Sequence, residues 1–418
     1  MPLVQRRDAL LLSVCLVVAC GPGALVRNGR LNEDALAVVE RRLPQIRGLA
    51  FKKPVVSVAM APEEIKAFLA QVLAEEYAPG DVERVEAVSV RLGLLPEGTR
   101  LRDAVSHLYA EEGAGFYDPR SKRLIIASHG MPSPGFGVRM LGALTGRDFV
   151  GEFIVSHELT HALQDQHFGL PTEPEPLMGG DDDRRLARHA LVEGDAIFAG
   201  MAYLLGRVPD AGAVGRTTEM LRAMPAAMAK DYPDVPLLVR ETITFVYDAG
   251  ATFVARALTD GGFATVDRIY ADPPASTEQV MHPERYFDRR DPPISVTVGG
   301  TASLERAGFV PAMDGALGEF HVRLLAGRAL PASDAARVAA GWGGDRLHAL
   351  VRGPEIVLVW MTAWDTTEDA RDFAATAPTF LPAAHVEQRG ARVLAILGPA
   401  GPVDLARLAA DVWSATPG

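Results

Sequence analysis

Hydrophobic and polar positions change their period several times along this chain of 418 residues. Apolar side chains recur every three or four positions before residue 112, which predicts helices over 62–77, 80–93 and 101–112. The period then changes across residues 116–126, where the short apolar runs FY and LII lie on either side of the turn sequence DPRS. This pattern is typical of a β-hairpin.

Helical spacing returns near residue 150, in the stretch EFIVSHELTHALQDQHFGL. After a polar, acidic loop at 170–183, the same spacing predicts helices over 184–205, 216–229 and 240–259. A proline-rich segment at 270–294 then interrupts the pattern. Residues 60–295 are therefore predicted to form one mostly helical domain with a small β-sheet.

The remainder of the chain, residues 296–418, has a different pattern. It predicts two strands (LHALVRG and EIVLVWMTA), a helix (TEDARDFAATAPTF), two further strands (AAHVEQRG and ARVLAILG) and a final helix over 403–414. This ββαββα order predicts a separate α+β domain. The expected fold class of the whole chain is α+β.

The first 19 residues combine a positive start with a short apolar run at 9–19. Such a run has the length of a signal-peptide core and is too short to span a membrane. It ends in the sequence VVAC, which resembles a bacterial lipoprotein signal and implies that Cys20 carries a lipid anchor. By the same resemblance, Gly21 permits sorting to an outer membrane. An ordinary signal peptide with a chance cysteine is the alternative interpretation.

Cysteine usage and charge fit an exported protein. Cys15 and Cys20 are the only cysteines, so the mature protein would keep no thiol for a disulfide. The formal net charge of -11 repels polyanions and disfavours nucleic acid as a partner. We expect a signal peptide at 1–19 and a tether with the first helix at 20–59, ahead of the two domains.

The sequence HELTH has the spacing of a zinc site. On a helix, residues four apart face the same way, about one turn from each other, so His157 and His161 can reach one ion. Glu158 lies beside that position and can act as a base towards water. The flanking residues are apolar, and an unpaired polar cluster on a buried helix would be costly. The alternative is an ordinary solvated helix face.

Catalytic zinc sites usually have three protein ligands, and four residues are candidates for the third: His167, His189, Glu193 and Asp195. If the helix continues through Gln164, His167 lies about 15 Å along its axis and cannot reach the ion. Glu193 follows His161 after 31 residues, enough for the chain to return on a second helix. Gly194 would help the two helices approach. The alternative for Glu193 is a helix-surface pair with His189.

The stretches GFYDP, HELTHALQDQHF, LVEGDA, YDAGATFV and STEQVMHPERY, in that order, resemble a family of exported or surface-attached zinc metallopeptidases of bacteria and archaea. The arrangement is similar to gluzincins, in which H-E-x-x-H on one helix is completed by a glutamate on the next. The later GWGGDR and WDTTEDARDF look like the same family's C-terminal module, so the resemblance covers nearly all of residues 60–415.

The resemblance implies a zincin-like metallopeptidase domain with Zn2+ held by His157, His161 and Glu193, and with Glu158 as the catalytic acid and base. The chain departs from the gluzincin pattern at Ile197, where an aspartate often supports the first histidine. Asp195 or Asp165 is the expected replacement for that supporting aspartate.

The reaction expected of such a site is hydrolysis by zinc-activated water, with Glu158 as general base. The tetrahedral oxyanion needs a further donor, for which Tyr247 and His282 are the candidates. The strand RLIIAS is expected to offer a free edge to an extended peptide substrate, by analogy with gluzincin-like folds.

Two other interpretations remain open. The zinc site could be structural or vestigial, with the C-terminal domain as the working part of a binding lipoprotein. The chain could also be a zinc hydrolase of a non-peptide amide.

Overall fold

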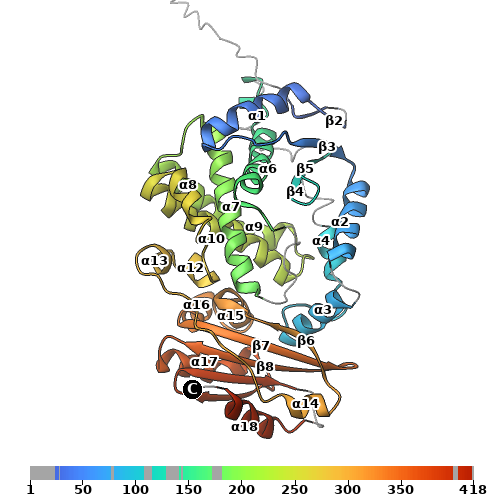
Figure 1. Ribbon diagram of the computed structural model, residues 1–418, viewed down its shortest axis with the longest axis vertical. Helices are drawn as coiled ribbons and strands as arrows, with labels where there is room; N and C mark the ends of the chain where they lie inside the picture. Colours follow the sequence, from blue (N-terminus) through green and yellow to red (C-terminus); the bar gives the residue numbers. More distant parts are fainter. Residues whose placement is uncertain are drawn as a thin grey trace, which may run out of the picture.

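The structure is a computed structural model that describes residues 24–27, 29–76, 80–107, 115–128, 141–142, 145–171, 181–398 and 403–416. A mostly helical N-terminal part is followed by a five-stranded antiparallel sheet with helices, seen below it in Figure 1. The α+β prediction is confirmed. The predicted signal peptide, Cys15 and Cys20 lie outside the described residues, as do parts of the predicted helix at 101–112 and the loop at 170–183.

The helices of the N-terminal part are α1 (Glu33–Arg47), α2 (Pro62–Glu76), α3 (Asp81–Leu92), α4 (Leu101–His107), α6 (Phe149–Phe168), α7 (Asp182–Leu205), α8 (Ala211–Arg222), α9 (Met224–Asp231), α10 (Leu237–Gly261), α11 (Phe263–Ile269), α12 (Thr277–Met281) and α13 (Glu284–Phe287). The single helix predicted over 216–229 is wrong, because the chain forms α8 and α9 with a break at Ala223. Pro225 lacks the N–H that a continuous helix needs there.

The centre of the N-terminal part is formed by three long helices, α6, α7 and α10, which share one apolar core with α1. Gly194 of α7 faces Gly250 of α10, where an added Cβ would lie 2.2 Å from the Gly250 carbonyl oxygen. The predicted role of Gly194 in bringing α7 to α6 is therefore wrong, because it serves the contact with α10. Between α6 and α7 the close approach is at Gly200, against Phe153.

We expect Gly250→Ala to destabilise the protein by about 2 kcal/mol, because the new Cβ would lie 2.2 Å from the Ala190 carbonyl oxygen and force the helices apart. Gly215→Ala, on an exposed face of α8 with no heavy atom within 4 Å, should instead stabilise by about 0.5 kcal/mol. Denaturant unfolding of both variants measures the difference. Equal midpoints would contradict the tight α7–α10 contact.

The N-terminal strands are β1 (Val26–Arg27), β2 (Arg30–Leu31), β3 (Val56–Met60), β4 (Gly115–Asp118) and β5 (Arg123–Ala127). The predicted hairpin is confirmed as the antiparallel pair β4–β5. However, β5 also pairs in parallel with β3, so it is the central strand of the order β3-β5-β4. The prediction that RLIIAS offers a free edge to a peptide is therefore wrong, because both of its edges are paired.

The C-terminal elements are α14 (Ala302–Arg306), β6 (Val310–Gly315), α15 (Gly318–Gly327), α16 (Ala332–Ala339), β7 (Trp342–Arg352), β8 (Glu355–Trp364), α17 (Thr367–Phe380), β9 (His385–Arg389), β10 (Arg392–Leu397) and α18 (Leu405–Ala415). The predicted ββαββα order is present from β7 to α18. The C-terminal part also contains α14, α15, α16 and the strand β6. This strand lies at one edge of the sheet, whose order is β6-β7-β8-β10-β9.

Both faces of this sheet are buried. Along β8, Leu358 and Trp360 point into the core shared with α15, α16 and α17, whereas Val357 and Val359 point into the core under α14 and α18. This alternation explains why the strand sequence is apolar throughout and not only at every second position.

The N-terminus of α7 is tied to the C-terminal part through polar contacts. The backbone N–H and hydroxyl of Thr277 donate to Asp183 Oδ1 at 2.8 and 2.6 Å, and the same hydroxyl accepts from the Phe320 N–H at 3.2 Å. Gly318 has φ +83°, and a Cβ there would collide with the Asp183 carboxylate. The junction therefore fixes one end of the helix that carries Glu193.

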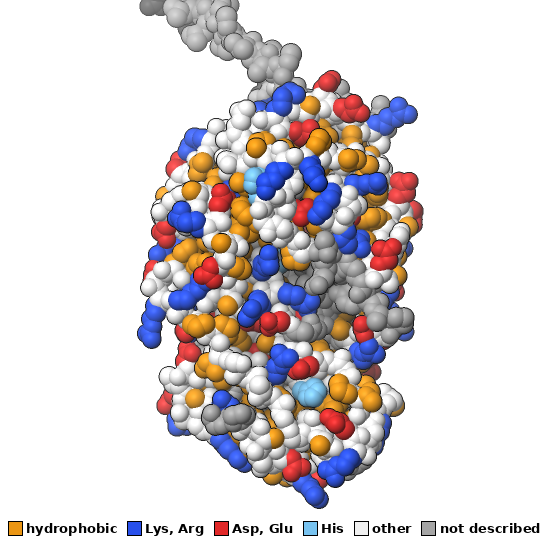
Figure 2. Space-filling view, viewed as in Figure 1, with side chains coloured by type: hydrophobic (Ala, Val, Ile, Leu, Met, Phe, Trp, Pro, Cys, Tyr) orange, Lys and Arg blue, Asp and Glu red, His pale blue; other side chains and the backbone are white. Residues whose placement is uncertain are grey.

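Acidic and basic side chains are interspersed over the described surface in the view of Figure 2. None of the described helices combines the length and the apolar character that a membrane span requires.

Candidate metal centre

Helices α6 and α7 bring three of the predicted residues together. His157 Nε2 lies 3.1 Å from His161 Nε2 and 3.1 Å from Glu193 Oε2, and His161 Nε2 lies 3.5 Å from Glu193 Oε1. All three side chains are buried, with at most 8% of each residue exposed. Two imidazoles and a carboxylate converge on one point in the interior, which forms a candidate metal site.

The spacing of the three ligand atoms suits a small tetrahedral ion. Nitrogen and oxygen ligands about 2.0–2.1 Å from such an ion lie roughly 3.3 Å from each other. The three observed separations of 3.1, 3.1 and 3.5 Å bracket that value. Burial opposes ionisation of Glu193, yet His161, His157 and His189 together hold the pKa of that carboxyl well below its ordinary value. The site thus offers one anionic carboxylate and two imidazole nitrogens as donors.

Gln164 determines which nitrogen of His161 faces the site. Its amide NH₂ donates to the Val192 carbonyl and to Asp195 Oδ2, both at 2.9 Å, so its Oε1 must face His161 Nδ1 at 2.8 Å. An amide oxygen can only accept, so Nδ1 carries the hydrogen. In the neutral ring the lone pair is then on Nε2, the atom that faces His157 and Glu193.

Asp195 supports this arrangement from the interior. Arg47 of α1, fully buried, donates to Asp195 Oδ1 at 2.8 Å and to Oδ2 at 3.0 Å, and the Tyr270 hydroxyl donates to Oδ2 at 2.9 Å. Asp195 therefore orients His161 indirectly, through Gln164. The other predicted supporting residue, Asp165, instead accepts from the Tyr117 hydroxyl at 2.7 Å and from Lys122.

We expect Gln164→Ala to weaken metal binding by about 10–100-fold, because His161 loses the acceptor that fixes its tautomer and ring orientation. Gln166→Ala is the matched control on the same helix, since Gln166 contacts Lys52 and Lys53 at the exposed side. Competition with a chromogenic chelator measures both affinities. Equal affinities for the two variants would contradict the role given to Gln164.

Glu158 is held at the edge of the small sheet. Its Oε2 accepts from the Tyr117 N–H of β4 at 2.9 Å. The carboxylate also interacts electrostatically with His161 and Glu193 of the ligand group. Burial raises the pKa of Glu158 to about 7, with His161 lowering it, Glu193 raising it and the Tyr117 N–H lowering it. A carboxylate near that pKa can both accept and return a proton.

The two predicted oxyanion donors lie in different surroundings. The Tyr247 ring of α10 is next to His157, with centroids 6.1 Å apart, so the structure brings Tyr247 to the candidate site. His282 Nε2 lies 2.9 Å from Glu319 Oε1 at the junction with α15. The catalytic roles of both residues stay predictions.

The remaining histidine candidates have separate contacts. His167 Nε2 lies 2.7 Å from the Ala50 carbonyl oxygen, as its position further along α6 leads one to expect. His189 Nε2 lies 3.0 Å from Glu193 Oε1, the i, i+4 pair that the sequence offered as the alternative for Glu193. Glu193 therefore makes both contacts, with His189 and with the two histidines of α6.

The sequence analysis missed Arg47 as a site residue and considered Gln164 only as a residue through which the helix continues towards His167. Gln164 carried a detectable signal, because it lies three residues after His161 on the same helix. Arg47 carried none, since it lies 148 residues from its partner Asp195.

Comparison with known families identifies one region of the chain. Residues 308–407, which include the five-stranded sheet, match a domain of unknown function, DUF8575. No curated protein and no solved structure matches the chain. The likeness to known proteins thus concerns the C-terminal part, and the candidate metal site lies outside it.

Proposed function

We propose that this protein is a zinc-dependent hydrolase, and more narrowly a metallopeptidase. The observation that carries the proposal is the buried His157, His161 and Glu193 set at tetrahedral spacing, with Glu158 adjacent to it. Three ligands from two helices are typical of catalytic zinc sites, whereas structural sites usually have four.

Zinc is the metal that this donor set favours. Imidazole nitrogen with one carboxylate suits zinc, whereas calcium and magnesium favour oxygen ligands. When bound, zinc supplies Lewis-acid chemistry, lowering the pKa of water and polarising a carbonyl group.

The protein's own residues would then move the protons. Glu158, oriented by the Tyr117 N–H, takes a proton from the attacking water and passes it to the leaving amine. Tyr247, beside His157, is the proposed donor to the developing oxyanion. A peptide substrate is the part of the proposal that rests on the resemblance to gluzincins.

The experiment that tests this function compares zinc-loaded and zinc-stripped protein on casein, on a quenched fluorescent peptide library and on a panel of non-peptide amides. Zinc-dependent cleavage of peptides supports the proposal. Cleavage of non-peptide amides alone favours the amidohydrolase alternative. Bound zinc with no hydrolysis of any substrate favours a structural or vestigial site.

We also propose that the protein is exported and lipid-anchored to the cell envelope through Cys20, on the outer membrane where one exists. Two or more acyl chains suffice for stable anchoring. In a bacterial host, wild-type protein should incorporate labelled palmitate and sediment with membranes, whereas Cys20→Ser should do neither. Equal labelling of both would contradict this anchor.

A further inference from the structure

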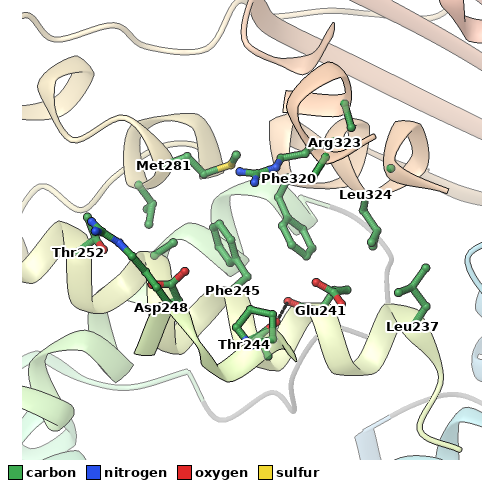
Figure 3. Close-up of a pocket in the computed structure, with 17 residues that line it drawn as sticks. Leu237, Glu241, Thr244, Phe245, Asp248, Thr252, Met281, Phe320, Arg323 and Leu324 are labelled. Atoms are coloured by element: carbon green, nitrogen blue, oxygen red, sulfur yellow. Dashed lines mark hydrogen bonds between the residues drawn. The ribbon is translucent and has the colours of Figure 1, made fainter. Parts of the chain in front are cut away.

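A second site is suggested by a cavity of about 530 Å³ at the junction of the two parts of the molecule. It lies between α10, α12, α15 and α16, as Figure 3 shows, and its residues are distinct from those of the metal centre. Its volume falls within the range of pockets for small ligands. Its walls come from both the helical part and the C-terminal part.

The floor of the cavity is apolar and one wall is acidic. Phe245 and Phe320, with ring centroids 4.6 Å apart, form the aromatic floor together with Leu324. Glu241 and Asp248 lie two turns apart on the same face of α10, so both carboxylates border the same space.

Asp248 is the acid with an unsatisfied atom. Its Oδ1 is buried and has no hydrogen-bond partner among the described residues. Burial raises the pKa of Asp248, while Arg222 and Arg323 oppose that shift by attraction. A buried acceptor without a partner is costly, and a cationic ligand group would remove that cost.

A basic group occupies the opposite side. Arg323 of α15 lies across the cavity from α10, as Figure 3 shows, and Arg222 of α8 also lines the cavity. Both are exposed, and both attract the Asp248 carboxylate electrostatically. In the view of Figure 3 the cavity therefore presents the carboxylates of α10 on one side, the Arg323 guanidinium on the other and the two phenylalanine rings between them.

We propose that this cavity binds a short peptide with free termini and an apolar side chain. Its ammonium group pairs with Asp248, its carboxylate pairs with Arg323, and its side chain covers Phe245 and Phe320. A zwitterion with an apolar centre is the ligand class that matches this order of charges. The proposal does not depend on the metal centre being catalytic.

Isothermal titration calorimetry on the full chain carrying Glu158→Gln tests the proposal, with Leu-Phe-Leu, its N-acetyl form and its C-terminal amide as probes. We expect saturable binding of the free tripeptide, weakened about tenfold by acetylation or amidation. Asp248→Asn should abolish the preference for the free amine, and Arg323→Gln the preference for the free carboxylate. Asp260→Asn, at an exposed pair with Arg256 on α10, is the matched control.

Three results would overturn the proposal: no saturable binding, preferences that survive Asp248→Asn and Arg323→Gln, or equal effects in the Asp260→Asn control. A tripeptide with photoreactive benzoylphenylalanine at its centre locates the bound ligand by mass spectrometry. Crosslinks to α15 or α16 support the cavity. Crosslinks confined to α6, α7 or Tyr247 of α10 place the peptide at the metal centre and contradict it. Circular dichroism checks that each variant is folded.

Discussion

Glu158→Gln is expected to abolish hydrolysis while the protein keeps its metal. The amide retains the shape of the side chain and can still accept from the Tyr117 N–H, which is 2.9 Å from Glu158 Oε2. It cannot take up a proton, so the step that generates the nucleophile loses its base. General-base contributions are typically about 10²–10⁴-fold, and we expect kcat to fall by at least about 10²-fold.

The measurement pairs kcat on a cleaved peptide with metal content by mass spectrometry. Glu219→Gln, at an exposed position on α8, is the matched control and should keep full activity. Retained metal with lost hydrolysis is the expected outcome for Glu158→Gln. Unchanged kcat in that variant would contradict its assignment as the base, and lost metal would show that Glu158 supports the site in another way.

Removing a ligand should have the largest effect on metal content. We expect His157→Ala and Glu193→Gln each to lose metal during dialysis, with affinity reduced by at least about 10²-fold, because two remaining donors hold the ion poorly. The bound metal also stabilises the folded state by mass action, so the wild-type melting temperature should fall on chelation. Neither variant's melting temperature should respond to the chelator.

His167→Gln is the control for the ligand variants, since His167 contacts the Ala50 carbonyl and lies outside the ligand group. It should retain a full equivalent of metal. Loss of metal from His167→Gln, or full occupancy in Glu193→Gln, would contradict the ligand set.

The two histidine ligands could be predicted from helical period, and Glu193 from the length of chain that follows them and the resemblance to gluzincins. His157 and His161 share a helix face at any i, i+4 spacing, and the following helix returned Glu193 to the same point. The support around them could not be predicted, because Arg47, Asp195 and Tyr270 meet across long sequence separations. Contacts of this kind depend on how the helices pack together, and the hydrophobic pattern of each segment does not predict them.

Prediction of the fold has the same limit as prediction of the site. Whether a segment is a helix or a strand follows from the period of its hydrophobic residues, and α17 was predicted with its observed bounds, Thr367–Phe380. Strand order does not follow, and β3 was not recognised, so β5 was wrongly taken as a free edge. Gly194 was recognised as a close-approach residue, but its partner Gly250 lies on a helix that sequence order does not place next to it.

The most direct test of the central claim is X-ray absorption at the zinc edge, combined with anomalous diffraction, on protein purified without added metal. The account predicts one zinc ion held by His157, His161 and Glu193, with a fourth position that no protein atom fills. A site with no zinc, or one closed by a fourth protein ligand such as His189, would contradict it.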